Sequence, residues 1–247
     1  MKSLIIAFAM YSKFPMPRVD WEKKALSWAL CWFPLVGRAV GAVLWLWLAL
    51  AGWLGFGAVF TAALALLLPI ALSGGIHLDG YADTCDALSS YGDREKKLEI
   101  LKDPHCGAFA VIRLCSYFAA YLALCACVQF TPQAGLLWMM ALVLERALSG
   151  YAVAAFPMAK NTGLAHTFAS TADRATVRRV LALLAAVLCC AMLALGGWAL
   201  VLAALAVLWR YHAVACKQFG GITGDLAGWF LQKTEIWMMA ALCVCQW

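Results

Sequence analysis

Residues 57–88 read GAVFTAALALLLPIALSGGIHLDGYADTCDAL, and this stretch decides the fold. From Gly57 to Ile76 it contains no charged side chain, and its length is close to the roughly 20 apolar residues that a helix needs to cross a bilayer. Three aspartates, at positions 79, 83 and 86, follow directly after this run. The stretch therefore predicts a membrane-spanning helix that ends at an acidic segment on the membrane surface.

The remaining sequence has the same alternation of apolar runs and short polar segments. Hydrophobic residues make up 65% of the chain and charged residues 13%, whereas soluble domains carry about 25% charged residues. We expect an all-α, polytopic membrane helix bundle that forms a single domain over residues 1–247. Its membrane helices, about seven, are predicted near residues 32–51, 57–76, 108–130, 136–156, 180–195, 198–215 and 226–247.

The distribution of basic residues predicts the orientation of this bundle. Most Lys and Arg lie in the N-terminal segment and in the loops 77–107, 157–179 and 216–225, while the intervening turns carry none. Basic residues are retained on the cytoplasmic side during insertion. We therefore expect a multi-pass protein of the cell inner membrane whose polar loops face the cytoplasm. The net charge of +6 is an orientation signal, and no nucleic-acid partner is expected.

Two local features complete the architectural prediction. The apolar N-terminal stretch Ser3–Tyr11 is short and runs into prolines, so we interpret it as an amphipathic segment on the inner leaflet. Gly37 and Gly41 form a GxxxG pair, which usually allows two membrane helices to approach closely. Membrane lipid is the expected surrounding partner.

The acidic motif that follows residue 76 predicts a metal site. Asp79, Asp83 and Asp86 are spaced by four and then three residues, which places them on one face of a helix. Clustered carboxylates repel one another unless a cation neutralises them, and hard oxygen ligands suit Mg²⁺. Because Mg²⁺ usually keeps positions for water and phosphate, the triad suggests a diphosphate substrate. The alternative is a solvated acidic loop, and the neighbouring His77 is either a bystander or a general base or phosphate contact.

Further polar residues are candidates for substrate binding. Some lie in the predicted cytoplasmic loops, where a basic side chain or a glycine-rich turn can contact phosphate, although an orientation signal or a plain turn explains them equally well. One lies beside Glu145 inside the fourth predicted span, where charges normally face the protein interior. These candidates are Lys102, Asp103, Arg146, Lys160, Thr223, Gly224 and Asp225.

Several motifs together resemble one enzyme family over nearly the whole chain. They are GGIHLDGYADTCDAL, LEILKDPHCGAFAVI, GGITGDLAG, FAMYSKFPMP, PLVG and the KNTGLA loop. This combination is similar to that of the cobalamin synthases, which are adenosylcobinamide-GDP ribazoletransferases. Ala87 and His105 depart from the usual pattern, in which glycine and arginine are common, and neither is a proposed metal ligand.

The resemblance implies a late step of vitamin B12 synthesis. The adenosylcobinamide phosphate group would pass from adenosylcobinamide-GDP to α-ribazole or its 5′-phosphate, with release of GMP and a requirement for Mg²⁺. By this analogy Asp79, Asp83 and Asp86 hold the metal, and His77 or a carboxylate accepts the hydroxyl proton. Lys102, Lys160 and the loop Thr223–Asp225 would position phosphates.

Other interpretations stay open at the level of sequence. Another Mg²⁺-dependent membrane transferase, such as a CDP-alcohol phosphotransferase or a prenyltransferase, would also need an acidic diphosphate site. A transporter is disfavoured because the ionisable residues gather at one membrane face. Homo-oligomerisation and association with other enzymes of the same pathway are compatible with the sequence, which does not distinguish them.

Overall fold

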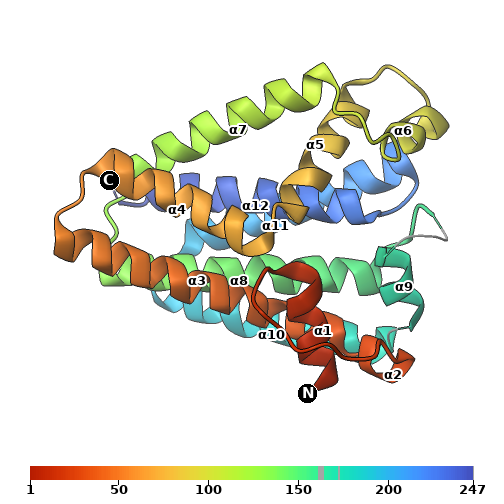
Figure 1. The fold of residues 1–247 in the computed structure, drawn as a ribbon, viewed down its shortest axis with the longest axis horizontal. Helices are drawn as coiled ribbons and strands as arrows, with labels where there is room; N and C mark the ends of the chain where they lie inside the picture. Colours follow the sequence, from red (N-terminus) through yellow and green to blue (C-terminus); the bar gives the residue numbers. More distant parts are fainter. Residues whose placement is uncertain (161–163, 172, 247) are drawn as a thin grey trace.

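The computed structural model describes residues 1–160, 164–171 and 173–246, and their regular secondary structure is helical. Figure 1 shows long helices that lie lengthwise, with shorter helices gathered at one end. In chain order the elements are α1 (Lys2–Tyr11), α2 (Lys23–Leu26), α3 (Ala29–Leu54), α4 (Ala58–Ser73), α5 (Ile76–Ser89), α6 (Arg94–Ile100), α7 (Ala108–Cys127), α8 (Pro132–Ala155), α9 (Leu164–Thr171), α10 (Arg174–Ala194), α11 (Trp198–Val214), the π-helical turn η1 (Ala215–Phe219) and α12 (Gly224–Val244).

The structure confirms the all-α polytopic bundle. Within the described residues, α3, α7, α8, α10 and the continuous α11–η1 helix are long and apolar enough to cross a membrane, and α4 adds a sixth span only when it is joined with α5. The predicted number of about seven also includes α12. That helix has 21 residues, but Gln232, Lys233 and Glu235 lie in its middle and lower its hydropathy.

Two helices form the centre of the bundle. Helix α8 packs against α3 and α10, and α12 packs against α5 and α11. The predicted close approach at the GxxxG pair is confirmed at the α3–α8 contact. A Cβ atom added to Gly37 would lie 2.7 Å from Cδ of Arg146, and one added to Gly41 would lie 2.8 Å from Cγ of Met139.

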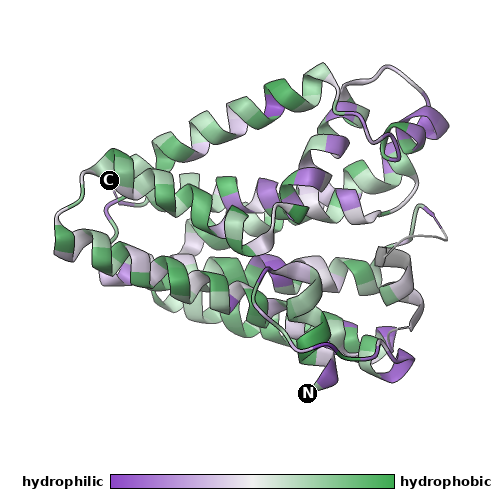
Figure 2. Ribbon diagram, in the orientation of Figure 1, coloured by the Kyte–Doolittle hydropathy of each residue, from purple (hydrophilic) through white to green (hydrophobic). Residues whose placement is uncertain are grey.

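Hydropathy divides the molecule into an apolar body and one polar end. Figure 2 shows hydrophobic residues along the long helices and hydrophilic residues around α5, α6 and the N-terminal segment. We call the end that holds α2, α5, α6 and α9 the polar end. Exposed tryptophans occur toward both ends of the body, including Trp53, which is 80% exposed, and Trp209, which is 75% exposed. Tryptophans at both interfaces are typical of membrane proteins.

The N-terminal segment belongs to the bundle. Helix α1 packs on α3, and Ile6 and Ala7 are completely buried. The backbone N–H of Lys13 donates to the carbonyl oxygen of Leu72 at 2.7 Å, which ties the residues after α1 to the end of α4. This attachment holds Tyr11 beside the polar end of the bundle.

Candidate active site

The acidic motif lies on a helix that turns sharply away from the preceding apolar one. Gly74 and Gly75 have φ values of 70° and 79°, in the left-handed region that glycine adopts readily. They separate α4 from α5, and the two helices meet at 96°. Helix α5 therefore lies across the polar end, outside the five spanning helices, and occupies the first part of the region predicted as a loop. Its helical form places Asp79, Asp83 and Asp86 on one face, as predicted.

Glycines bring α5 against the start of α12. A Cβ atom added to Gly80 would lie 2.7 Å from the backbone oxygen of Asp225, and one added to Gly228 would lie 2.8 Å from the backbone oxygen of His77. The two backbones thus approach closely on both sides of this contact. Asp225, which is distant from the triad in sequence, consequently joins the acidic cluster.

The GGITGD segment also connects α12 to the chain that carries Lys160. Ile222 N–H donates to Pro157 oxygen at 2.8 Å, and Ala159 N–H donates to Ile222 oxygen at 2.9 Å. Gly221, with a φ of 153°, allows this close pairing. Thr223 then caps α12, because its Oγ1 accepts a hydrogen bond from Leu226 N–H at 3.2 Å.

The four carboxylates repel one another. Burial, reinforced by the charges of Asp79, Asp225 and Asp86, raises the pKa of Asp83 to about 6. Burial also raises the pKa of Asp225, although the nearby Lys160 opposes this shift. The pKa of Lys160 is itself lowered by burial and by the charge of Lys102, and the charge of Asp225 opposes this shift, so Lys160 lies close to both residues.

The donor set fits a hard divalent cation in its chemistry, although its side chains are not arranged around one point. Among the described residues no group of three or more His, Cys, Asp or Glu side chains is placed to hold a metal ion. Asp86 contacts Gly107, where an added Cβ would overlap its carboxylate. Carboxylate oxygens are nevertheless the ligands that Mg²⁺ prefers, and a cation would relieve the repulsion that adds to the effect of burial on the pKa of Asp83.

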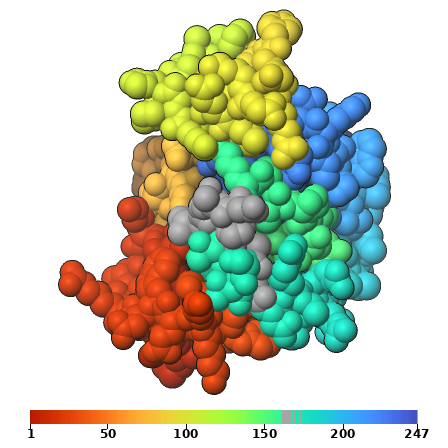
Figure 3. All heavy atoms as spheres, turned by 90° about the vertical axis from the view of Figure 1, so that its right-hand side faces the viewer, coloured from red at the N-terminus to blue at the C-terminus, as the bar shows by residue number. Residues whose placement is uncertain are grey.

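A cavity of about 460 Å³, which we call the chamber, opens beside this cluster. Its apolar wall contains aromatic residues that sequence reasoning did not select, Tyr11, Phe33 and Phe168. No motif distinguished these residues from ordinary packing residues. The predicted site residues that line the chamber are His77, Asp79, Lys102, Lys160, Thr223, Gly224 and Asp225. Figure 3 looks directly onto the polar end of the molecule.

A second cavity, which we call the groove, lies between α5, the loop 104–106 and α7. Its volume is about 520 Å³, and it is lined by Asp79, Asp83, Leu114 and Phe118. Asp79 therefore borders both the chamber and the groove. The first aspartate of the motif stands between two cavities that could each admit a substrate.

His77 is a poor proton acceptor in this environment. Its side chain is 6% exposed, and its Nε2 atom has no hydrogen-bond partner among the described residues. Burial, together with the charge of Arg146, lowers the pKa of His77 to about 3. General bases work best with a pKa near the operating pH, so His77 is poorly matched to that role.

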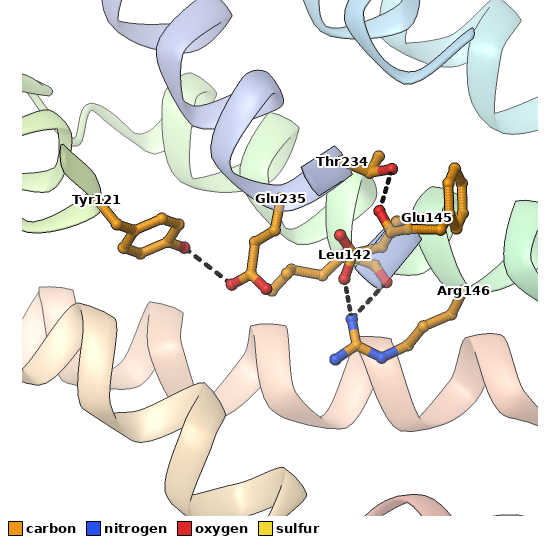
Figure 4. A network of polar contacts seen from close by, with 7 residues as sticks. Tyr121, Leu142, Glu145, Arg146, Thr234 and Glu235 are labelled. Carbon is orange, nitrogen blue, oxygen red and sulfur yellow. Dashed lines mark hydrogen bonds and ion pairs between the residues drawn. The ribbon is translucent and has the colours of Figure 1, made fainter. Parts of the chain in front are cut away.

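Two predicted binding residues lie away from the chamber. Asp103 is exposed and accepts a hydrogen bond from the backbone N–H of His105 at 2.9 Å. Arg146 is 3% exposed, pairs with Glu145, and donates to the carbonyl oxygen of Leu142 at 3.0 Å. Figure 4 shows this pair deep in the bundle near Glu235. Substrate contact by Asp103 or Arg146 stays a prediction, and residues 161–163 of the KNTGLA loop lie outside the described part of the chain.

Comparison with known proteins places nearly the whole chain in one family. The cobalamin-5-phosphate synthase family matches residues 3–243. The chain belongs to this family. A protein of Lachnoclostridium phytofermentans named adenosylcobinamide-GDP ribazoletransferase is 42% identical over 99% of this chain and 93% of its own length. A protein of the same name from Pseudomonas fluorescens is 37% identical over 93% of this chain and 94% of its own length. Another from Clostridium botulinum is 29% identical over 98% of this chain and 97% of its own length. No solved structure matches this chain.

Proposed function

We propose that this protein transfers the adenosylcobinamide phosphate group from adenosylcobinamide-GDP to α-ribazole or its 5′-phosphate. The names of its relatives support this reaction. The observation that carries the proposal is the position of Asp79, which borders both cavities and lies in one acidic cluster with Asp83 and Asp225. Such a position suits a reaction in which two substrates meet at a diphosphate.

The reaction breaks one phosphorus–oxygen bond and forms another. A ribose hydroxyl oxygen attacks the phosphorus nearest the cobinamide, and the bond from that phosphorus to the bridging oxygen breaks, so that GMP leaves with the bonding electrons. The hydroxyl proton passes to a carboxylate. His77 is poorly suited to this step because its pKa is lowered to about 3.

Mg²⁺ is the proposed cofactor. Asp79, Asp83 and Asp86, joined by Asp225, would hold it. When bound, the ion neutralises the diphosphate and the charge that develops on the leaving GMP. Lys102 and Lys160 add positive charge at the chamber wall, and Lys160 is held by a hydrogen bond from its Nζ to the carbonyl oxygen of Leu98 at 3.1 Å.

The first test is a product assay. The purified protein is incubated with Mg²⁺, adenosylcobinamide-GDP and α-ribazole, and GMP is measured. We expect GMP and a corrinoid product in equal amounts, with loss of turnover in EDTA and recovery with added Mg²⁺. Release of CMP from a CDP-alcohol without GMP release from adenosylcobinamide-GDP would instead favour the phosphotransferase alternative.

The location of the site is part of the proposal. The basic loops support a cytoplasmic polar end in the inner membrane, because positive residues favour that side. Both substrates and Mg²⁺ are then reached from the cytoplasm.

A further inference from the structure

The apolar part of the chamber is built from aromatic rings on four helices. Tyr11 of α1 and Phe33 of α3 have ring centroids 4.2 Å apart. The ring of His77 lies 6.3 Å from that of Tyr11 and nearly parallel to it, and Phe168 of α9 lies 6.2 Å from Tyr11. Segments distant in sequence thus converge on one aromatic wall.

Simple core packing accounts for the contacts among these rings but not for the space beside them. The chamber measures about 460 Å³, which falls within the roughly 300–1,000 Å³ typical of small-molecule sites. Its other wall carries Asp79, Asp225 and Lys160. A cavity with one aromatic wall and one charged wall suits a ligand that is flat and apolar at one end and polar at the other.

An unpartnered polar atom also belongs to this wall. His77 lines the chamber, and its Nε2 has no hydrogen-bond partner among the described residues. Buried polar groups are nearly always hydrogen-bonded. The nitrogen atom itself has almost no accessible surface, so His77 contributes to the chamber wall through its ring, which is stacked on Tyr11.

We propose that the chamber binds the nucleoside acceptor, with the benzimidazole base of α-ribazole among Tyr11, Phe33 and Phe168. This inference rests on the proposed function and assigns one of its two substrates to one cavity. The base is flat and apolar, and aromatic side chains stack favourably on such rings. The ribose then lies toward Asp79 and Asp225, where its hydroxyl group reaches the acidic cluster.

The size of the other substrate agrees with this assignment. Adenosylcobinamide-GDP carries a corrin macrocycle as well as a nucleotide, and it far exceeds the nucleoside in volume. In an in-line displacement the attacking and leaving oxygens lie on opposite sides of the phosphorus. An acceptor in the chamber therefore leaves the donor to approach from the groove and the open polar end, on the other side of Asp79.

Steady-state kinetics of matched variants test the assignment. Phe33→Leu removes the aromatic face while keeping a similar apolar volume. We expect its KM for α-ribazole to rise about tenfold, from the loss of stacking, and its KM for adenosylcobinamide-GDP to stay within about twofold of the wild-type value. Phe60→Leu makes the same change on α4 at a ring that is 51% exposed and should change neither KM.

A second variant and a ligand competition keep the test independent of folding. Val153→Phe places a ring into the chamber and should also raise the KM for α-ribazole selectively. In the wild-type protein, free dimethylbenzimidazole should inhibit competitively against α-ribazole and not against adenosylcobinamide-GDP. This competition decides the question even when both variants elute as aggregates.

The outcomes separate this inference from the proposed function. Absence of GMP release by well-folded wild-type protein contradicts the function itself. An active wild type whose Phe33→Leu and Val153→Phe variants keep the normal KM for α-ribazole, or show a raised KM only for adenosylcobinamide-GDP, overturns the assignment of the chamber. Competition of dimethylbenzimidazole against adenosylcobinamide-GDP alone would also overturn the assignment of the chamber.

Discussion

At the scale of single residues, the carboxylates of α5 depend on a partner from the other end of the sequence. Asp225 lies close enough to Asp83 to raise the pKa of the latter, and both border cavities at the polar end. The acidic site is thus assembled from two helices. Removing either contribution changes both the charge that holds a cation and the repulsion within the protein.

Replacement of Asp225 by Asn tests its part in the site. We expect turnover to fall by about a thousandfold or more, because the loss of one carboxylate weakens the hold on the metal ion whose positive charge would neutralise the diphosphate. Thermal unfolding should also show a smaller stabilisation by Mg²⁺. Asp20→Asn removes an exposed carboxylate outside both cavities and serves as the control. Full activity of Asp225→Asn with an unchanged response to Mg²⁺ would remove this residue from the site.

The raised pKa of Asp83 predicts a pH dependence of stability in EDTA. The folded protein holds this proton more tightly than the unfolded chain, so the carboxylate destabilises the fold increasingly as pH rises from about 4 to about 6. Relative to wild type, Asp83→Asn should be stabilised at pH 7, with the difference shrinking toward pH 4.5. Unfolding temperatures measured across this range check the trend. A difference that is constant with pH would show that neither burial nor the neighbouring carboxylates raise the pKa of Asp83.

At the scale of elements, the contact between α5 and α12 sets the geometry of the site. Gly80 and Gly228 allow the two backbones to approach, and Thr223 begins α12 beside the acidic helix. Small residues at helix contacts permit such proximity in membrane proteins. The position of Asp225 therefore follows from glycines that have no chemical role of their own.

Gly80→Ala should separate these helices. The new Cβ would meet the Asp225 backbone at 2.7 Å, and overpacking of this kind costs about 1–3 kcal/mol. We expect a lower unfolding temperature and at least a tenfold loss of activity. Gly52→Ala, in α3, has open space around the added Cβ and should be neutral or slightly stabilising. Equal behaviour of the two variants would argue against a close α5–α12 contact.

At the scale of the whole molecule, the protein combines a polar end with a charged network inside its body. Glu235 accepts a hydrogen bond from Tyr121 at 2.9 Å, and Arg146 pairs with Glu145 in the same region. Ionisable groups inside membrane domains normally face the protein interior and pair there. These contacts let α12 occupy the centre of the bundle despite its polar residues, because α8 and α7 pack against it.

Labelling of single cysteines tests the arrangement of the two ends. Cys106 is exposed in the loop before α7, at the polar end of the molecule. Cys245 is exposed just after the C-terminal end of α12, at the other end of the molecule. With the other cysteines replaced, a membrane-impermeant maleimide should label Cys106 in inverted inner-membrane vesicles and Cys245 in intact spheroplasts. Labelling of both residues from the same side would contradict the proposed topology.

Much of the architecture was predictable because hydrophobicity is local information. Long uncharged runs specify helices for a bilayer, so the predicted bounds of the first and sixth spans agree with α3 and α11 to within a few residues. The one-face arrangement of Asp79, Asp83 and Asp86 followed from helical periodicity alone. The start of α10 at Arg174 was missed, although Asp173 caps it through a hydrogen bond from Thr176 N–H at 3.3 Å.

By itself the sequence determined that this chain forms a membrane helix bundle with an acidic motif on one helical face, because apolar length and residue spacing act over a few turns of helix. Only the tertiary structure decided that Asp225 joins this motif, that Arg146 pairs inside the bundle, and that Tyr11, Phe33 and Phe168 enclose a chamber. These relations depend on where α1, α3, α9 and α12 meet in space. No spacing along a chain encodes such meetings directly, because they result from packing between helices that are distant in sequence.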